Sequence, residues 1–69
     1  MKVTYDLSLD VLRILLSDAP IAESDEDKPG VILDYAEDGR VVGLEILDAS
    51  KHVNNPGALD YEVIGLKSA

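Results

Sequence analysis

The chain has 69 residues, no cysteine and 14 acidic against 6 basic residues, a formal net charge of −8. A chain this short has one core and buries only about 60% of its unfolded surface, so we expect a single small domain over residues 1–69. The composition excludes disulfides and thiolate metal sites, and the acidic balance argues against binding to phosphate backbones. Without a long apolar run or a signal-like N-terminus, we expect a cytoplasmic protein that binds neither nucleic acid nor membrane.

Residues 2–17 predict a first hairpin, because residues 2–6 and 11–16 alternate apolar and other side chains around a short polar connection. The alternative is a helix over residues 8–17, in which Leu9, Leu12 and Leu16 would share one face and Ser8 could cap the first turn. We favour the strands, because the apolar run is short and turn formers flank it.

The connection in this hairpin places Asp6, Ser8 and Asp10 at alternate positions, as in the first half of a calcium loop. The second half is missing, because no glycine stands at the sixth position and Ser17 occupies the twelfth, where a glutamate is needed. We interpret the segment as a polar turn. A weak divalent-cation or small-ligand site remains the alternative function.

Residues 18–30 predict a linker or an edge strand, with Ile21 as the only large apolar residue. Four acidic residues follow it, at Glu23, Asp25, Glu26 and Asp27. Such a run is usually a solvated loop, and the alternative is a docking surface for a basic protein.

Residues 31–47 predict a central hairpin, because Asp38-Gly39 lies between two apolar runs and is typical of a two-residue type I′ turn. This turn sets the register of the two strands. The expected pairs on one apolar face are Tyr35 with Val42, Leu33 with Leu44 and Val31 with Ile46.

The segment after this hairpin predicts one short helix near residues 48–53, capped by Asp48 or Ser50, then a turn at residues 54–57 and a last strand from residue 59. Asp48, Ser50 and His52 are the residue types of a nucleophilic triad, but neither helix nor strand spacing brings Ser50 and His52 within hydrogen-bond reach. We therefore predict no catalytic, cofactor-binding or metal-binding residues, and no enzyme activity.

Together these elements predict an α+β, mainly β fold: an antiparallel sheet or roll of about five strands built from hairpins. Several apolar residues fall on the outer faces of these strands, namely Val11, Leu15, Ile32, Val41 and Leu47. A curled second layer, the helical turn or another copy of the chain must cover them, so a homodimer is one hypothesis.

Four segments carry a family resemblance: "YD" at residues 5–6, "DVL" at 10–12, "PGVILDYAEDGRVVGLEILDAS" at 29–50 and "LDYEVI" at 59–64. They resemble a prokaryotic family of short proteins catalogued as domain of unknown function twenty-two eighty-three, although Arg13 stands where many such proteins have tyrosine. The resemblance implies a compact, mainly β domain without assigned activity or cofactor, sometimes associated with small toxin-like proteins as an antitoxin.

From residues and resemblance together we expect a small non-enzymatic interaction module without a cofactor. It would either self-associate or bind a basic protein partner, using the acidic run and an outer sheet face as contact surfaces.

Overall fold

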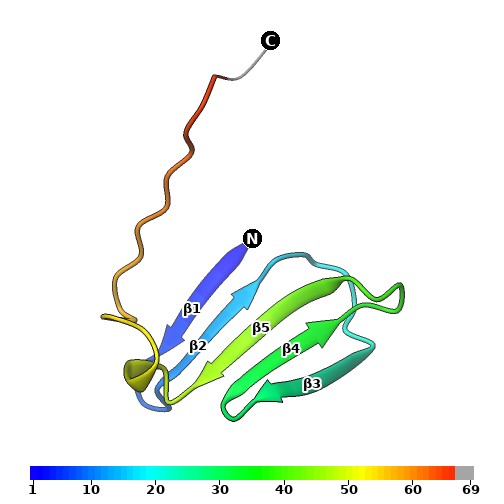
Figure 1. Cartoon of the computed structure of the whole chain (residues 1–69), viewed down its shortest axis with the longest axis horizontal. Helices are drawn as coiled ribbons and strands as arrows, with labels where there is room; N and C mark the ends of the chain where they lie inside the picture. Colours follow the sequence, from blue (N-terminus) through cyan, green and yellow to red (C-terminus); the bar gives the residue numbers. More distant parts are fainter. Residues whose placement is uncertain (67–69) are drawn as a thin grey trace.

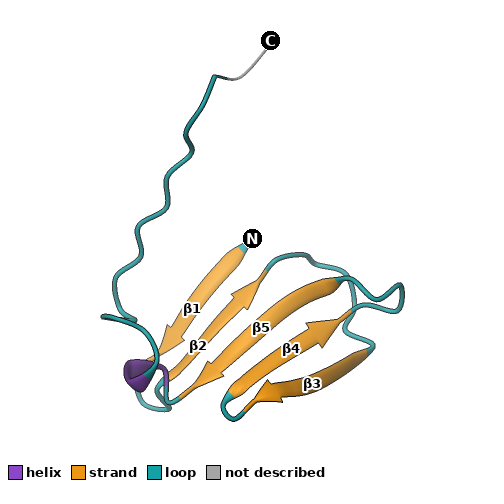
Figure 2. Cartoon of the chain, viewed as in Figure 1, coloured by secondary structure: helices purple, strands orange, loops and turns teal. Residues whose placement is uncertain are grey.

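The computed structural model describes residues 1–66, and five strands within residues 2–47 form one antiparallel sheet. Its strands are β1 (Lys2–Asp6), β2 (Val11–Leu15), β3 (Glu23–Lys28), β4 (Val31–Tyr35) and β5 (Val41–Leu47). They lie in the order β1-β2-β5-β4-β3, and a 3-10 turn, η1 (Ala49–Lys51), follows β5 (Figures 1 and 2). The predicted fold class is confirmed, and of its two forms the open sheet is the observed one.

The first hairpin is confirmed as a pair of strands, and the helical alternative over residues 8–17 is wrong. In the register of β1 and β2, Val3 lies opposite Ile14 and Tyr5 opposite Leu12. β2 also pairs with β5, where Ile14 lies opposite Leu44. An interior strand gains backbone hydrogen bonds on both sides, which outweighs the helical spacing of the leucines.

The central hairpin keeps the predicted register along most of its length, with Leu33 opposite Leu44 and Val31 opposite Ile46. The predicted type I′ turn is wrong. The Gly39 N–H donates to the Ala36 carbonyl at 2.9 Å, the Ala36 N–H donates to the Arg40 carbonyl at 2.9 Å, and within this loop only Gly39 has a positive φ, 88°. The loop therefore has three residues, a type I turn followed by a left-handed glycine.

This longer loop changes the pairing beside it, because a β-bulge lies between the loop and the regular ladder. Tyr35 lies opposite Val41, where a two-residue turn would pair it with Val42. Val42 is 1% exposed, and its carbonyl accepts hydrogen bonds from the backbone N–H groups of Leu16 and Ser17. The bulge thus fastens the segment that connects β2 to β3.

The fifth strand is the acidic run and not the C-terminal segment. β3 pairs with β4 through a turn at Pro29-Gly30, in which Gly30 has a φ of 82°, the conformation that a type II turn requires. The predicted strand from residue 59 is wrong, because residues 59–66 leave the sheet and pair with none of its strands (Figure 1). The edge-strand interpretation of residues 18–30 is confirmed for residues 23–28.

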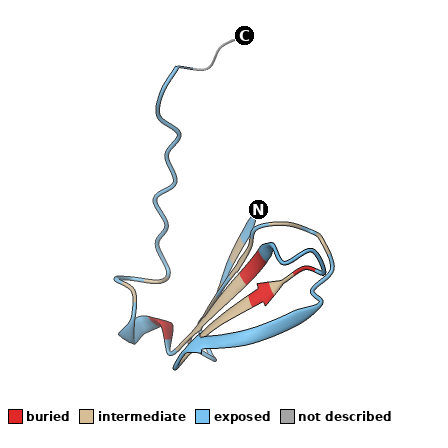
Figure 3. Cartoon of the chain, turned by 45° about the vertical axis from the view of Figure 1, so that its right-hand side comes forward, coloured by how far each residue is buried: buried red, intermediate tan, exposed pale blue. Residues whose placement is uncertain are grey.

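The sheet is a single layer, and no second sheet or helix packs across it within residues 1–66 (Figure 3). Residues 53–59 lie beside only the β1–β2 part of one side, next to Val3, Leu12 and Ile14. The smallest dimension is 18 Å, and the buried residues are Asp34, Ala36, Val42, Gly43 and Ala49. The chain exposes 5574 Å². A compact protein of 7.4 kDa exposes about 4,200 Å². The extended residues 59–66 contribute much of the roughly 1,400 Å² difference, because Val63 and Ile64 are 80% and 81% exposed.

The two sides of the sheet differ in chemistry, because successive residues of a strand point to opposite faces. The register groups eight side chains into what we call the apolar face: Val3, Tyr5, Leu12, Ile14, Val31, Leu33, Leu44 and Ile46. The opposite face carries four of the five residues predicted to point outward, Val11, Leu15, Ile32 and Leu47, together with an Arg13–Glu45 ion pair at 3.4 Å and the buried Asp34. The fifth, Val41, lies opposite Tyr35 beside the bulge and is exposed.

Candidate functional site

A polar cluster joins the turn after β1 to the 3-10 turn after β5. The Asp10 carboxylate accepts hydrogen bonds from the Tyr5 hydroxyl at 2.7 Å, the Ser50 hydroxyl at 2.6 Å and the Ser50 backbone N–H at 3.0 Å. The Asp10 backbone carbonyl also accepts from the Ala49 N–H at 2.9 Å. One residue therefore satisfies the first N–H groups of η1, and it does so from a distant part of the chain.

The backbone of Asp10 places its carboxylate in this position. Asp10 has a φ of 55°, a left-handed conformation that aspartate tolerates better than most residues. Hydrogen bonds from Ser50 and then from Tyr5 lower the pKa of Asp10, because they favour its charged form. The hydrogen bond from the Tyr5 hydroxyl to Asp10 raises the pKa of Tyr5, because the phenol loses this bond when it ionises.

The predicted local caps of the helical turn are wrong. Asp48 precedes η1 with a φ of 51°, and its side chain makes no capping hydrogen bond. Ser50 lies within η1 and donates to Asp10. The cap is Asp10, which no local sequence pattern identifies, because it lies 40 residues away from Ser50.

The structure does not bring Asp48, Ser50 and His52 together as a catalytic triad. The Ser50 hydroxyl is bonded to Asp10, and the His52 Nε2 lies 3.6 Å from the position that a Gly30 side chain would occupy. In the part of the chain that the structure describes, no hydrogen bond joins Ser50 to His52. The cluster therefore lacks the nucleophile–base contact of covalent catalysis.

The loop that resembles half of a calcium site is a self-contained turn. One oxygen of Asp6 accepts from the Ser8 hydroxyl at 2.8 Å and from the Leu9 N–H at 3.0 Å, and these bonds lower the pKa of Asp6. No group of three or more histidine and acidic side chains among residues 1–66 could hold a metal ion. The geometry lends no support to a cation site here.

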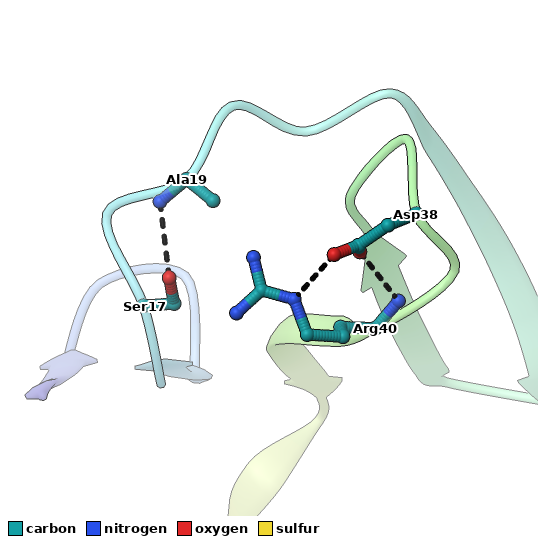
Figure 4. A network of polar contacts seen from close by, with 4 residues as sticks. All are labelled: Ser17, Ala19, Asp38 and Arg40. Carbon is teal, nitrogen blue, oxygen red and sulfur yellow. Dashed lines mark hydrogen bonds and ion pairs between the residues drawn. The ribbon is translucent and has the colours of Figure 1, made fainter.

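A shallow hollow of about 510 Å³ lies between residues 19–22 and the central hairpin loop. Figure 4 shows the Arg40 guanidinium pointing toward the segment in which the Ala19 N–H donates to the Ser17 hydroxyl at 3.1 Å. Arg40 is already paired, because its Nε lies 2.8 Å from Asp38 Oδ2. The hydrogen bond from the Arg40 backbone N–H and, to a smaller extent, the one from its side chain lower the pKa of Asp38. The hollow therefore offers an anion little unpaired positive charge.

A buried carboxylate that the sequence pattern does not reveal lies on the opposite face. Asp34 is 2% exposed, its Oδ1 accepts from the Ser24 hydroxyl at 2.6 Å, and its Oδ2 has no partner. Asp34 and Leu15 both lie over Gly43, where an added Cβ would be 3.1 Å from Asp34 Oδ2. The missing side chain of Gly43 makes room for this carboxylate, which links β3 to β4.

β3 presents the acidic run as an exposed sheet edge. All six of its residues are exposed, and the ion pairs within residues 1–66, Arg13–Glu45 and Arg40–Asp38, involve none of them. Charged side chains along an edge prevent strands of other molecules from adding there. η1, the only helical segment that the structure describes, is far too short to span a bilayer.

Comparison with known families agrees with this picture. Residues 2–50 match the family described as "Protein of unknown function (DUF2283)". The chain belongs to this family. No curated protein and no solved structure matches it.

The DUF2283 match covers all five strands and ends within η1, so the Tyr5–Asp10–Ser50 cluster lies inside it. The cluster acts as a structural tie in this family member, because its hydrogen bonds join β1 and the turn after it to η1. The remaining candidate functional site is the apolar face, whose eight side chains are half-buried on one side of a single-layer sheet. The C-terminal segment lies outside the matched residues.

Proposed function

We propose that this DUF2283 protein is a non-enzymatic interaction module that binds a second copy of itself through the apolar face. The observation that carries the proposal is a single-layer sheet with eight large, half-buried apolar side chains on one side. Residues 53–59 lie beside only Val3, Leu12 and Ile14 of them. Burial of apolar surface is the main force in protein association, so such a face favours a partner.

The amount of uncovered surface supports a dimer. A standard interface buries about 800 Å² on each partner, and the C-terminal segment would contribute to it beside the apolar face, because Leu59, Tyr61 and Val63 are 66%, 70% and 80% exposed. The eight residues of the apolar face are uncharged, and the nearest acid of the β3 edge on the same side is Asp25, opposite Leu33. Two copies can therefore meet face to face despite a net charge of −8 on each chain.

Sedimentation or light scattering at tens of micromolar tests the proposal, and a monomer there would contradict it. Two matched variants locate the interface, because Leu44 and Leu47 lie on β5 but point to opposite faces. Leu44→Gln should raise the dimer dissociation constant at least about tenfold, while Leu47→Gln should leave it unchanged. Circular dichroism of both variants controls for loss of the fold.

A second candidate, binding of a basic protein partner in an antitoxin-like role, is favoured by the uncompensated charge of β3. The probe is a small basic protein encoded beside this gene, where one exists. The affinity of this basic protein for the chain should fall with added salt. Neutralising Glu23, Asp25 and Asp27 should weaken the binding more than neutralising Glu37, Asp48 and Asp60. Equal losses would exclude β3 as the contact.

A further inference from the structure

The C-terminal segment, residues 59–66, has the pattern of a strand without a neighbouring strand. Leu59, Tyr61 and Val63 alternate with two acids, and their exposed fractions are 66%, 70% and 80%. Among the described residues, no backbone hydrogen bond reaches this segment. An extended chain with one apolar side and free backbone groups is suited to strand pairing.

The sheet offers two free edges, and charge distinguishes them. β3 already carries four exposed acids, so Asp60 and Glu62 of the segment would face like charges there, which is destabilising. β1 contains one acid, Asp6, at its end and begins with Lys2. The β1 edge is therefore the edge that can accept the segment.

Charge alone does not set the direction of pairing, because an antiparallel arrangement places Glu62 toward Lys2 and Asp60 toward Asp6, and a parallel one exchanges the two. We take the antiparallel arrangement because it is slightly more stable per residue. The apolar side of the segment would then extend the apolar face beside Val3. Eight extended residues span about 26 Å, enough to follow the roughly 17 Å of β1.

The segment does not occupy the β1 edge of its own chain. A turn in which the Ala58 N–H donates to the Asn55 carbonyl at 3.0 Å, with Asn55 at a φ of 45°, directs it away from the sheet (Figure 1). Its contact with β1 is loose, because a hollow of about 490 Å³ separates Met1 and Val3 from Leu59 and Tyr61. A second copy presents the same edge, and exchange of identical segments closes a two-fold dimer.

We infer that residues 59–64 of one copy pair antiparallel with the β1 edge of a second copy, and that the exchange is reciprocal. The inference rests on the proposed self-association and names the segment that completes it. The β3 edge stays free in this dimer.

Proline substitution in the full-length chain tests the pairing, because proline cannot donate to a ladder. Glu62→Pro should raise the dimer dissociation constant at least about tenfold and abolish amide-exchange protection of residues 59–64. Leu66→Pro, the same change beyond the paired residues, should do neither. A wild-type dimer that Glu62→Pro leaves intact would overturn the exchange but not self-association, whereas a monomeric wild type would overturn both.

Cysteine pairs test whether the contact is between chains, because the natural sequence has no thiol. A chain with Thr4→Cys mixed with a chain with Asp60→Cys should form the mixed disulfide in preference to either homodimer, because Asp60 lies opposite Thr4 when Glu62 lies opposite Lys2. In the control, a chain with Glu26→Cys at the β3 edge takes the place of the Thr4→Cys chain. It should form no mixed disulfide with the same partner chain. Protection of residues 59–64 in a monomer would show pairing within one chain and overturn the inference.

Discussion

The Asp10 carboxylate accepts a 2.6 Å hydrogen bond from the Ser50 hydroxyl, although the two residues lie 40 positions apart. Tyr5, at the end of β1, donates to the same carboxylate. One side chain therefore ties the first strand and the first turn to η1, where the DUF2283 match ends. This tie stabilises the end of the sheet at which β1 and β5 finish, in a protein that has little buried core.

Acid should weaken the fold through Asp10. Because its folded-state pKa is lowered, its stabilising contribution is complete above the ordinary value of 3.8 and is lost as the pH falls through the lower, folded-state pKa. Asp10→Asn should lower the melting temperature at pH 7 and reduce its dependence on pH below about 4. Thermal melts between pH 7 and pH 2 measure both effects.

Asp48→Asn is the matched control, because the Asp48 side chain makes no capping bond to η1. It should melt as the wild type does across the acid range. If Asp10→Asn showed the wild-type acid dependence, the contribution would belong to the other carboxylates with a lowered pKa, Asp6 and Asp38.

Tyr5 should ionise at a higher pH than an ordinary tyrosine. Its bond to Asp10 raises its pKa above 10.0, so its stabilising contribution is present below that pH and is lost as the pH rises through the folded-state pKa. The difference between the absorbance titrations of wild type and Tyr5→Phe isolates this one phenol. Its midpoint should fall in the Asp10→Asn background, and an unchanged midpoint would contradict the assigned cause.

The elements that local pattern predicts well are those in which two signals agree. Alternation and a turn signal together predicted the central hairpin, and Leu33 does lie opposite Leu44. The Asp38-Gly39 pair located the turn but not its length, because a left-handed glycine also fits a three-residue loop. One added loop residue then displaced Val42 from its expected partner.

The features that the sequence pattern missed depend on distant neighbours. β3 has almost no strand-forming residues and exists because β4 offers a free edge. Residues 59–66 have a good strand pattern but no strand beside them in the sheet. Asp10 could be recognised as a turn residue, yet its bond to Ser50 requires the topology that brings the two turns together.

Three glycine-to-alanine variants should separate steric from conformational requirements. Gly43→Ala should cost about 1–3 kcal/mol, because its Cβ would lie 3.1 Å from Asp34 Oδ2 and 3.3 Å from the Ile14 carbonyl. Gly39→Ala has open space but a φ of 88°, so about 1 kcal/mol of backbone strain is expected. Gly57→Ala should change the unfolding free energy by less than about 0.5 kcal/mol. Urea denaturation measures all three.

The hydrogen-bonded pair of exposed Ser24 and buried Asp34 should show a non-additive response. Ser24→Ala leaves both Asp34 oxygens without a partner in a residue that is 2% exposed, which should cost about 1–3 kcal/mol of unfolding free energy. Adding Asp34→Val removes the stranded carboxylate and supplies a β-branched side chain, so the double variant should be more stable than Ser24→Ala alone. Urea denaturation of the three variants completes the cycle. Additive losses would mean that the carboxylate finds another partner once Ser24 is removed.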